Sequence, residues 1–433
     1  MKNKNNIIII VLTIIIIGIT VGTVYFLNKK DRSESPNTPV ERPTDKPADL
    51  TVSLNNGYVL NMIQVVNSKE KDNYLISPYS IEIALNMLKE GADKETYNQI
   101  NNVVKDRDIP TFNSKNRISV ANALFIKNSE KKGISNDYIN KLQTSYKTDL
   151  VIDRFRNPDK INNWVKEKTY GMIPKILNDI SPDFVLGLAN AVAIDVEWEN
   201  EFECEYTASA DFITSNETKK VEMMHDKRRE DYLKTNDEIG IILPYKSYTS
   251  SGKEDYYDGE NSTKLEFVAI MPLKKDIRNY INDLTESKFN ELLNGFKTPS
   301  MNQEIILDIP RFEYSFNNTH FMYDLMDLGI KDVFNPDLSD LSKMKNSSNL
   351  DKLYVSDAIH MTYISLKEKG TKAAAVTYFG IDKATAAADE FERINITFNK
   401  PFMYMIRDSK TKEIIFFGVV ENPNEWKGST CNK

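Results

Sequence analysis

Residues 368–377 read Glu-Lys-Gly-Thr-Lys-Ala-Ala-Ala-Val-Thr, and this stretch decides the fold. A charged start and one glycine, Gly370, lead into a run of small side chains. In an extended strand, successive side chains point to opposite faces. One face would carry only small side chains, those of Thr371, Ala373, Ala375 and Thr377. The opposite face would carry Lys372, Ala374 and Val376, which tolerate contact with water.

Such a segment is suited to enter a sheet that already exists. A strand that slides between two packed strands needs small inward side chains, because protein interiors are dense and overpacking is costly. The alternative is an exposed Ala-rich loop, since Ala is weak in strands. About 30 residues without a clear period separate Gly370 from Pro401. Loops of this length in compact domains are usually functional or disordered.

Both flanks of this long loop are strongly patterned. Residues 353–366 predict a strand upstream, and residues 402–406 and 414–420 predict two strands joined by the polar turn 408–412. Apolar runs at 184–196 and 265–271 predict two more buried strands. The loop is therefore expected to be tethered to strands at both ends.

Helices are predicted mainly in the first half of the chain. Apolar residues recur every three or four positions over 80–90, up to Gly91, with Ser77 and Pro78 suited to the helix entry. A second helix is predicted over 161–168 and ends before Gly171. Helices first and strands later indicate an α+β fold rather than an alternating α/β fold.

Several motifs in a fixed order give the chain a resemblance to a known family. The segments are 73–81, 84–92, 121–125, 161–169, 188–198, 309–312, 328–334, 360, 368–377 and 398–402. In this order and spacing they resemble the serpins, serine protease inhibitors of the suicide-substrate kind, over residues 50–424. The resemblance implies one α+β domain with three β-sheets, about eight to nine helices and an exposed reactive-centre loop over 368–393.

The resemblance also implies a mechanism. The loop would be bait for a serine or cysteine protease, which cuts it and forms an acyl-enzyme. The cut loop would then insert into the central sheet as a new strand before the acyl bond is hydrolysed. Serpin loop insertion is a known example of strand addition and of released strain. The protein would thus be a protease inhibitor and not an enzyme.

Two groups of residues carry this mechanism by resemblance. The hinge would consist of Glu368, Gly370, Thr371, Ala373, Ala374, Ala375 and Thr377. The region where the sheet opens, called the shutter and the breach, would contain Ser77, Ser80, Asn190, Trp198 and His360. Buried polar groups need partners, so the shutter can favour one arrangement of the sheet over another. From the residues alone, His360 could equally be an ordinary core histidine, and Glu368 a surface carboxylate.

The bond that a protease would cut depends on where counting begins. Counting from Gly370 places it between Ala384 and Thr385, which suits elastase-like or subtilisin-like proteases. A shift of one residue places it between Lys383 and Ala384, which predicts trypsin-like targets. The loop looks longer than is usual for the family before Pro401, so counting from that end gives a different bond.

The N-terminus predicts a membrane anchor. Residues 1–6 are basic, and residues 7–27 are apolar and uncharged over a length that can span a bilayer as a helix. Residues 28–49 form a Pro-rich spacer, and residues 425–433 a C-terminal tail. We expect a single-pass signal anchor with the inhibitory domain outside the cell. Secretion after signal cleavage is the alternative, although no Ala-x-Ala-like site follows the apolar run.

Composition limits the partners. The formal net charge is -7 and no basic cluster is present, which argues against nucleic acid as a partner. No cofactor or metal is implied, and the partners expected of a monomer are the target protease and, through residues 7–27, the bilayer. Frequent Ile, Asn and Lys suggest bacterial coding bias. The two cysteines, Cys204 and Cys431, could pair outside the cell or remain two free thiols.

Two other functional classes stay open at this stage. A non-inhibitory serpin could serve as a cell-surface binding protein, but its usual mark is a bulky, charged or proline-broken hinge. A membrane-anchored hydrolase would need a catalytic group, and the three histidines, His225, His320 and His360, lie far apart in the sequence. No Gly-x-Ser-x-Gly, His-Glu-x-x-His or phosphate-loop motif is present.

Overall fold

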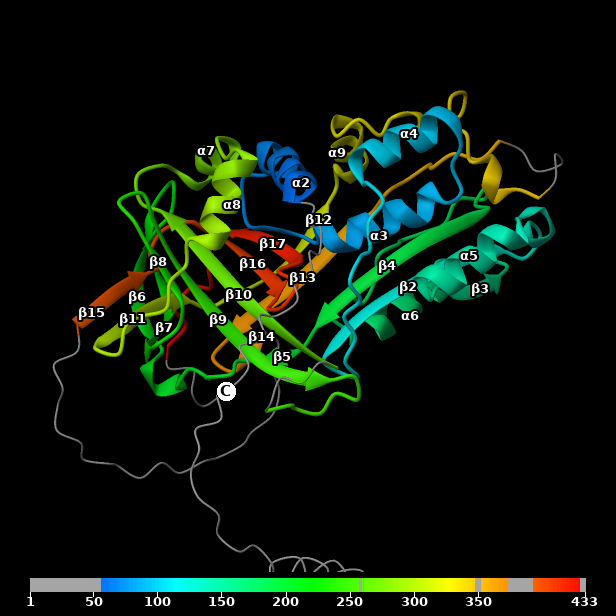
Figure 1. Cartoon of the computed structure of the whole chain (residues 1–433). Coiled ribbons are helices and arrows are strands. Elements are labelled where there is room, and N and C mark those ends of the chain that lie inside the picture. Colours follow the sequence, from blue (N-terminus) through cyan, green and yellow to red (C-terminus); the bar gives the residue numbers. More distant parts are fainter. Residues whose placement is uncertain (1–55, 257–258, 260, 347–351, 372–391, 429–433) are drawn as a thin grey trace, which may run out of the picture. The chain divides into compact units, whose positions relative to one another are not determined.

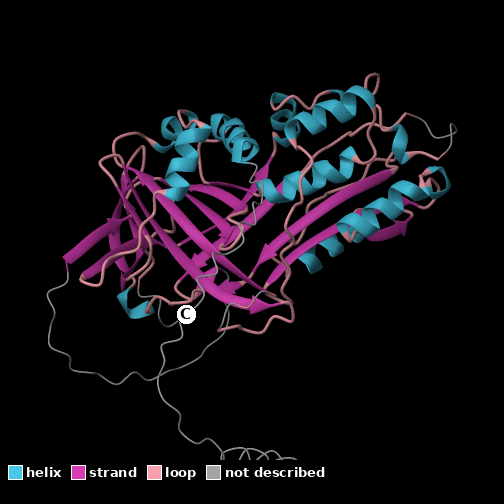
Figure 2. Cartoon of the chain, in the orientation of Figure 1, coloured by secondary structure: helices cyan, strands magenta, loops and turns pink. Residues whose placement is uncertain are grey.

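The computed structural model describes residues 56–256, 259, 261–346, 352–371 and 392–428, which lie in the unit Val52–Lys433. Within these ranges the fold is α+β, as predicted, with strands through the middle and helices around them (Figure 2). Its eight α-helices are α2 (Asn56–Lys69), α3 (Pro78–Lys89), α4 (Lys94–Val103), α5 (Asn136–Tyr146), α6 (Asp159–Lys168), α7 (Ile277–Asn282), α8 (Glu286–Asn294) and α9 (Phe321–Asp327).

A six-stranded antiparallel sheet forms the most deeply buried layer. Its order is β1 (Tyr74–Ile76), β17 (Ile414–Val420), β16 (Phe402–Asp408), β10 (Ser262–Pro272), β9 (Glu238–Thr249) and β8 (Tyr232–Lys234). Every residue of β16 and β17 is buried, which explains why their sequences are almost continuously apolar. Figure 1 shows α2, α7 and α8 grouped together beside this sheet.

A four-stranded sheet lies at one end of the molecule. Its order is β15 (Glu392–Thr397), β11 (Gln303–Pro310), β7 (Thr218–Arg228) and β6 (Ala208–Ile213). The edge strand β15 runs parallel to β11 and lies directly after the long loop. This strand was not predicted from the sequence, because no clear period was found between Gly370 and Pro401 and residues 392 and 393 were assigned to the loop, although Arg393 to Thr397 alternate polar and apolar side chains.

The third layer is a sheet divided into two parts. One part has the order β3 (Asp149–Asp153), β2 (Ile118–Lys127) and β4 (Leu186–Ile194), and the other β12 (Phe312–Asn318), β13 (His360–Lys367), β14 (Gly370–Thr371) and β5 (Val196–Glu197). Since β4 and β5 follow each other along the chain, the two parts form one split sheet. This split is why the described residues form four hydrogen-bonded sheets rather than the three expected.

Helix α3 lies beside β4 and links the split sheet to the core (Figure 1). Ser77 caps the helix by accepting a hydrogen bond from the backbone N–H of Ser80, and Pro78 occupies the first turn, as predicted. On the opposite face of the sheet, α6 packs the Trp164 ring edge-on against Phe125 of β2. The sheet is therefore sandwiched between these two helices.

Two sequence predictions about this region are wrong. The strand predicted over 353–366 begins only at His360, and residues 352–359 are irregular. Leu353 and Val355 still pack against the core, and the Val355 N–H donates to the carbonyl of Val333, so their apolar pattern reflects packing without a strand ladder. The reading of two free thiols is also wrong, because Cys204 is disulfide-bonded. The other cysteine, Cys431, lies outside the described residues.

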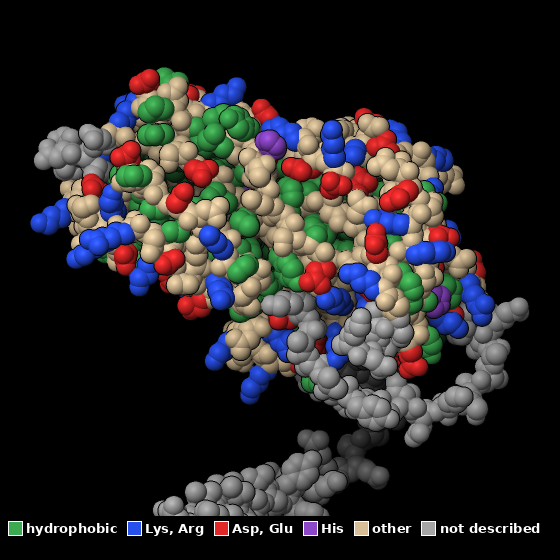
Figure 3. All heavy atoms as spheres, turned by 180° about the vertical axis from the view of Figure 1, so that it is seen from behind, with side chains coloured by type: hydrophobic (Ala, Val, Ile, Leu, Met, Phe, Trp, Pro, Cys, Tyr) green, Lys and Arg blue, Asp and Glu red, His purple; other side chains and the backbone are tan. Residues whose placement is uncertain are grey.

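The surface carries charges of both signs. Figure 3 shows Lys and Arg side chains interspersed with Asp and Glu side chains over one face of the molecule. The charges on this face therefore do not form a patch of a single sign.

Candidate functional site

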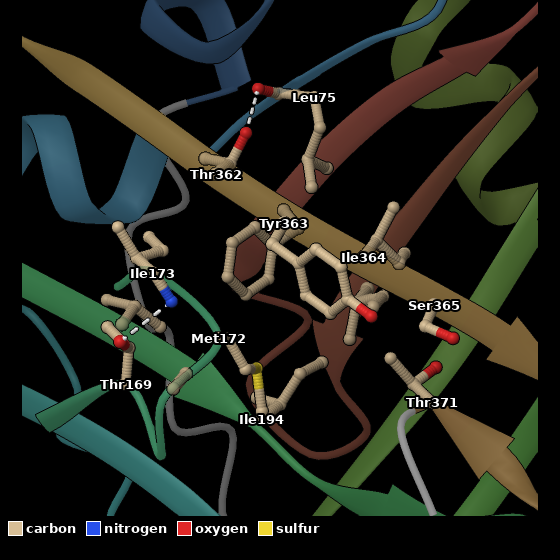
Figure 4. A pocket seen from close by; sticks show the side chains of 14 residues that line it. Leu75, Thr169, Met172, Ile173, Ile194, Thr362, Tyr363, Ile364, Ser365 and Thr371 are labelled. Carbon is tan, nitrogen blue, oxygen red and sulfur yellow. Dashed lines mark hydrogen bonds between the residues drawn. The ribbon is translucent and has the colours of Figure 1, made fainter. Parts of the chain in front are cut away.

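The candidate site is the opening in the split sheet. Strands β4 and β13 are not paired with each other, and β14 is inserted between β5 and β13 at one end of the opening only. Below β14 lies a small pocket that is partly open to solvent. Ile194, Thr362, Ile364 and Thr371 lie around it (Figure 4). Among the described residues, β4 and β13 therefore leave their facing edges unpaired, so a longer strand that enters here can form hydrogen bonds with both.

A short segment covers the outer side of the opening. Met172 and Ile173 follow α6 and line the same pocket (Figure 4). The Ile173 N–H donates to the Thr169 hydroxyl, which in turn donates to the carbonyl of Val165 on α6. Any strand that fills the pocket must therefore displace these side chains.

The first hinge residues already form part of the sheet. Gly370 pairs with Lys367 on β13 and with Glu197 on β5. A Cβ atom at Gly370 would lie 2.2 Å from the backbone oxygen of Val196, and the φ of Gly370 is +147°, so only glycine fits. Thr371 is buried on the inner face of the sheet, the face that the alternation assigns to it, and its hydroxyl lies 2.6 Å from the Tyr245 hydroxyl.

Trp198 supports the hinge from below. Its fully buried ring stacks on Tyr245, with the ring centroids 4.4 Å apart. Its indole N–H donates to the carbonyl of Lys367, and its backbone N–H donates to the carbonyl of Lys369, each at 2.9 Å. One aromatic residue therefore holds the chain on both sides of Glu368.

Glu368 is a buried carboxylate and not a surface group, so the alternative reading of this residue is wrong. It accepts hydrogen bonds from the Arg311 guanidinium and from the Thr207 hydroxyl. Its backbone carbonyl accepts from the Phe202 N–H at 2.9 Å. Arg311 also lies 3.6 Å from the Glu222 carboxylate, so one cation is shared by two buried anions. The hinge therefore begins at the buried ion pair of Glu368 and Arg311.

His360 holds the other strand that borders the opening. Its Nε2 atom accepts a hydrogen bond of 3.1 Å from the backbone N–H of Ser77, so the ring is neutral with its proton on Nδ1. Burial lowers the pKa of His360 to about 4, because a charged imidazolium would lose its hydration. The Ser77 hydroxyl donates to the carbonyl of Ile415 on β17 at 2.7 Å. This half of the shutter connects β13 to α3 and to the core sheet.

Asn190 holds the facing strand in the same way. Its side-chain oxygen accepts from the Ser80 hydroxyl on α3, and its amide group donates to the side-chain oxygen of Asn122 on β2 at 2.7 Å. Ser77 and Ser80, one turn apart on one helix, thus bind the two strands that border the opening. The predicted shutter residues come together as two linked halves, with α3 between them.

Several predicted residues lie outside the part of the chain that the structure describes. These are the hinge residues Ala373, Ala374, Ala375 and Thr377, and the candidate bond residues Lys383, Ala384 and Thr385. Four residues of the site were not singled out from the sequence, namely Asn122, Thr207, Tyr245 and Arg311. Only Asn122 and Arg311 belong to motifs that carry the family resemblance, so the motifs could have pointed to those two.

The predicted anchor, residues 7–27, also lies outside the described residues. Among the residues that are described, no helix is both long and apolar enough to cross a membrane. Likewise, within those residues, no cluster of His, Cys, Asp and Glu side chains forms a metal site.

Comparison with known proteins gives a consistent match. A protein-family model described as "Serpin (serine protease inhibitor)" matches residues 53–423. A serpin-like protein of Methanosarcina mazei is 28% identical over 87% of this chain and 88% of its own length. Serpin A3-6 of Bos taurus is 27% identical over 86% of this chain and 88% of its own length.

Solved structures resemble the chain in the same way. The native state of tengpin, a thermophilic serpin, is 32% identical, with a TM-score of 0.70 over 85% of this chain and 92% of that one. The latent state of tengpin is 30% identical, with a TM-score of 0.67 over 86% and 97%. Thyroxine-binding globulin in complex with thyroxine, at 22% identity and a TM-score of 0.67, shares the fold.

Proposed function

The chain belongs to the serpin family, and from this premise we propose that it inhibits serine or cysteine proteases by inserting its cleaved loop into the split sheet. The proposal rests on the opening between β4 and β13, which β14 occupies at one end only. Strand β14 already pairs on both sides at one end, and Thr371 of β14 lines the pocket together with Ile194 and Ile364 of the bordering strands.

The register of β14 specifies how the rest of the loop would enter. Gly370 and Thr371 pair with Glu197 and Val196 on one side and with Lys367 and Leu366 on the other. If both registers continue without a bulge, Thr377 reaches a position between Asn190 on β4 and His360 on β13. The last small residue of the hinge would then meet both halves of the shutter.

The inner faces of the bordering strands explain why the hinge must be small. Ile194 and Ile364 line the pocket, and in the continued register they flank position 373. Val192 and Thr362 line it one step further, and flank position 375. Four bordering side chains already occupy much of the space, so alanine at both positions avoids overpacking.

Many weak contributions together would drive the insertion. A net hydrogen bond contributes only about 0.5–1.5 kcal/mol, so roughly ten new bonds would contribute on the order of 10 kcal/mol. Burial of apolar surface in the pocket would add to this. A protease held as an acyl-enzyme would be carried with the inserting strand, away from the place where it bound.

The direct test is to trap the covalent complex. Residues 49–433 are mixed with pancreatic elastase, subtilisin and trypsin, and the products are separated on denaturing gels. A complex that survives denaturation supports suicide inhibition. Clean cleavage of the loop by all three proteases, without any complex, would refute inhibition of these protease classes and favour a non-inhibitory binding protein.

The same gels identify the reactive bond. The mass of the released C-terminal peptide distinguishes cleavage between Ala384 and Thr385, which fits elastase-like or subtilisin-like targets, from cleavage between Lys383 and Ala384, which fits trypsin-like targets. Turnover of ester or peptide substrates by the chain itself, abolished by Ser and His substitutions, would instead indicate a hydrolase.

The proposal includes the location of the inhibitor. We propose that residues 7–27 anchor a monomer in the bacterial cell membrane with the inhibitory domain outside, because their length and lack of charge suit a membrane-spanning helix. Protease added to intact cells should remove the domain and leave the anchor. Protein that lacks the N-terminal apolar segment and is recovered from the medium would instead indicate secretion after signal cleavage.

A further inference from the structure

The C-terminal segment of the domain lies across the breach. The Asn424 N–H donates to the carbonyl of Arg311 at 3.1 Å, and the Asn424 carbonyl accepts from the Glu222 N–H at 3.2 Å. The Asn424 side chain also accepts from the N–H of Glu313 at 3.1 Å. The two residues whose side chains form the charged cluster with Glu368 are therefore joined through their backbones to one residue near the C-terminus.

The contacts continue beyond Asn424. Glu425 forms a β-bridge with Val221, and the Trp426 N–H donates to the carbonyl of Lys220 at 3.0 Å. Residues 424–426 thus extend along the start of β7 as a short added strand. Cys431 follows five residues after Trp426 in the sequence.

Cys204 lies beside the same cluster. Its Sγ atom is 3.9 Å from Nη2 of Arg311, the nitrogen that donates to Glu368. The segment that carries Cys204 contacts Glu368 twice more, through the backbone of Phe202 and the hydroxyl of Thr207. Cys204 is disulfide-bonded and only half-buried, so a small reductant can reach it. The only other cysteine of the chain is Cys431.

We propose that the C-terminal segment 424–426 and the Cys204 disulfide together form a redox-sensitive clasp that restrains the opening of the breach. The clasp holds Arg311 and the segment 202–207 in place, and through them Glu368 and the start of the hinge. Its effect on inhibition rests on the proposed function, whereas its effect on the breach does not. Oxidised protein keeps the loop outside the sheet for longer, and reduced protein opens more readily.

The switching chemistry is ordinary thiol–disulfide exchange. A dithiol such as dithiothreitol attacks the disulfide and forms a mixed disulfide, which its second thiol resolves. Two electrons and two protons pass to the protein sulfurs, and the reagent is oxidised to a cyclic disulfide. Two cysteine thiols remain, and the covalent link that fixes the segment 202–207 is lost.

Hydrogen exchange tests the clasp on the full chain in mild detergent. The reporters are the amide hydrogens of Trp198 and Phe202, which bond to the carbonyls of Lys369 and Glu368. We expect dithiothreitol to speed their exchange on the order of tenfold, because the breach opens locally more often. Amides in the pairing of β2 with β4, such as that of Ala123, should not change.

Variants separate the clasp from side effects of the reductant. Cys204→Ser and Cys431→Ser should each reproduce the fast exchange without reductant, and dithiothreitol should then have no further effect. Asn424→Pro removes the N–H that bonds to Arg311, leaves both cysteines intact, and should act in the same direction. Equal exchange at Trp198 and Phe202 in oxidised and reduced protein, or two free thiols in the purified chain, would overturn the proposal.

Inhibition is then measured on the same samples. The reduced protein should lose inhibitory activity faster on storage than the oxidised protein. If neither form makes a protease complex but hydrogen exchange at Trp198 and Phe202 still depends on the redox state, the clasp is supported and the proposed inhibition is refuted. If both forms inhibit, lose activity on storage at the same rate and show equal hydrogen exchange, the clasp is refuted and the inhibition is supported.

Discussion

At the scale of single residues, Arg311 is the group on which the hinge depends most directly. It is the buried cation that binds Glu368, and it faces Glu222 as a second anion. Its Nε atom has no hydrogen-bond partner among the described residues, so the cluster is not fully satisfied. Such a cluster stabilises one arrangement of its side chains. Removal of one member destabilises the protein, because it leaves a buried charge without its partner.

We predict that Arg311→Ala destabilises the native protein on the order of 3 kcal/mol, because the Glu368 carboxylate would be left buried without its cation. Glu368→Gln should cost less, since it leaves no uncompensated anion at that position. Urea unfolding midpoints of the two single variants and the double variant would show the coupling. Strictly additive effects would contradict the direct ion pair.

His360 gives the shutter a dependence on pH. Its folded pKa of about 4 lies below the usual value near 6.5, so protonation favours the unfolded or opened state. The stability contributed by the neutral ring is fully present above pH 6.5 and is lost as the pH falls toward 4. The loss amounts to about 1.4 kcal/mol for each pH unit in this window.

The matched measurement compares the wild type with His360→Gln by urea unfolding between pH 7 and pH 4. A glutamine keeps an acceptor near the Ser77 N–H but does not titrate. We expect the wild type to lose its stability advantage steadily as the pH falls. Parallel curves over the whole range would show that His360 does not titrate in this window.

At the scale of elements, the alternating faces of the inserted strand make a sharp prediction. Position 373 would point inward between Ile194 and Ile364, whereas position 374 would point outward, on the same face as Lys372. A long charged side chain is therefore excluded at the first position and accepted at the second.

We predict that Ala373→Lys turns the inhibitor into a substrate, with at least about tenfold more inhibitor consumed per protease trapped. Ala374→Lys adds the same charge and volume one residue later and should leave inhibition nearly unchanged. Thr371→Arg and Ala373→Pro should also turn the inhibitor into a substrate. The comparison is made by titrating a fixed amount of protease, and equal stoichiometries for the two lysine variants would refute the predicted register.

Helix α3 acts as one element with two attachments. Ser77 binds the strand that carries His360, and Ser80 binds the strand that carries Asn190. A strand inserted between them must pass over the start of this helix. In the continued register Thr377 would arrive at the same level, where its hydroxyl could bond to the groups that line the opening.

At the scale of the whole molecule, the native fold leaves a sheet incomplete. The pocket between β4 and β13 is lined mainly by apolar side chains, and the strands beside it are not joined. A cut within the loop frees a strand that can fill this space. The cleaved molecule should therefore be more stable than the intact one, which is unusual for a nicked protein.

We predict that cleavage between residues 378 and 391 raises the midpoint of thermal unfolding by on the order of 10 °C, because the inserted strand forms roughly ten new hydrogen bonds. A protease that cuts the loop without being trapped provides the cleaved protein for calorimetry. The Ala373→Lys variant, cut in the same way, should show a smaller rise. An unchanged midpoint after cleavage would show that the loop does not insert.

Features that depend on local periodicity could be predicted from the sequence alone. Alternation in 368–377 predicted the inner face to which Thr371 belongs, helical spacing predicted α3 with its Ser77 cap, and continuous apolar runs predicted β16 and β17. Motif order indicated the family. These features follow from side-chain direction and backbone preference, which neighbouring residues express without any knowledge of the rest of the chain.

Features that depend on contacts between distant segments could not be predicted from the sequence and became known only from the folded chain. It buried Glu368 against Arg311, divided the shutter between Ser77 and Ser80, and placed Asn424 across the breach. Ser77 and His360 are 283 residues apart in the sequence. A carboxylate or histidine has the same local pattern whether it is exposed or buried, so its partner and its pKa are set by the fold that brings those segments together.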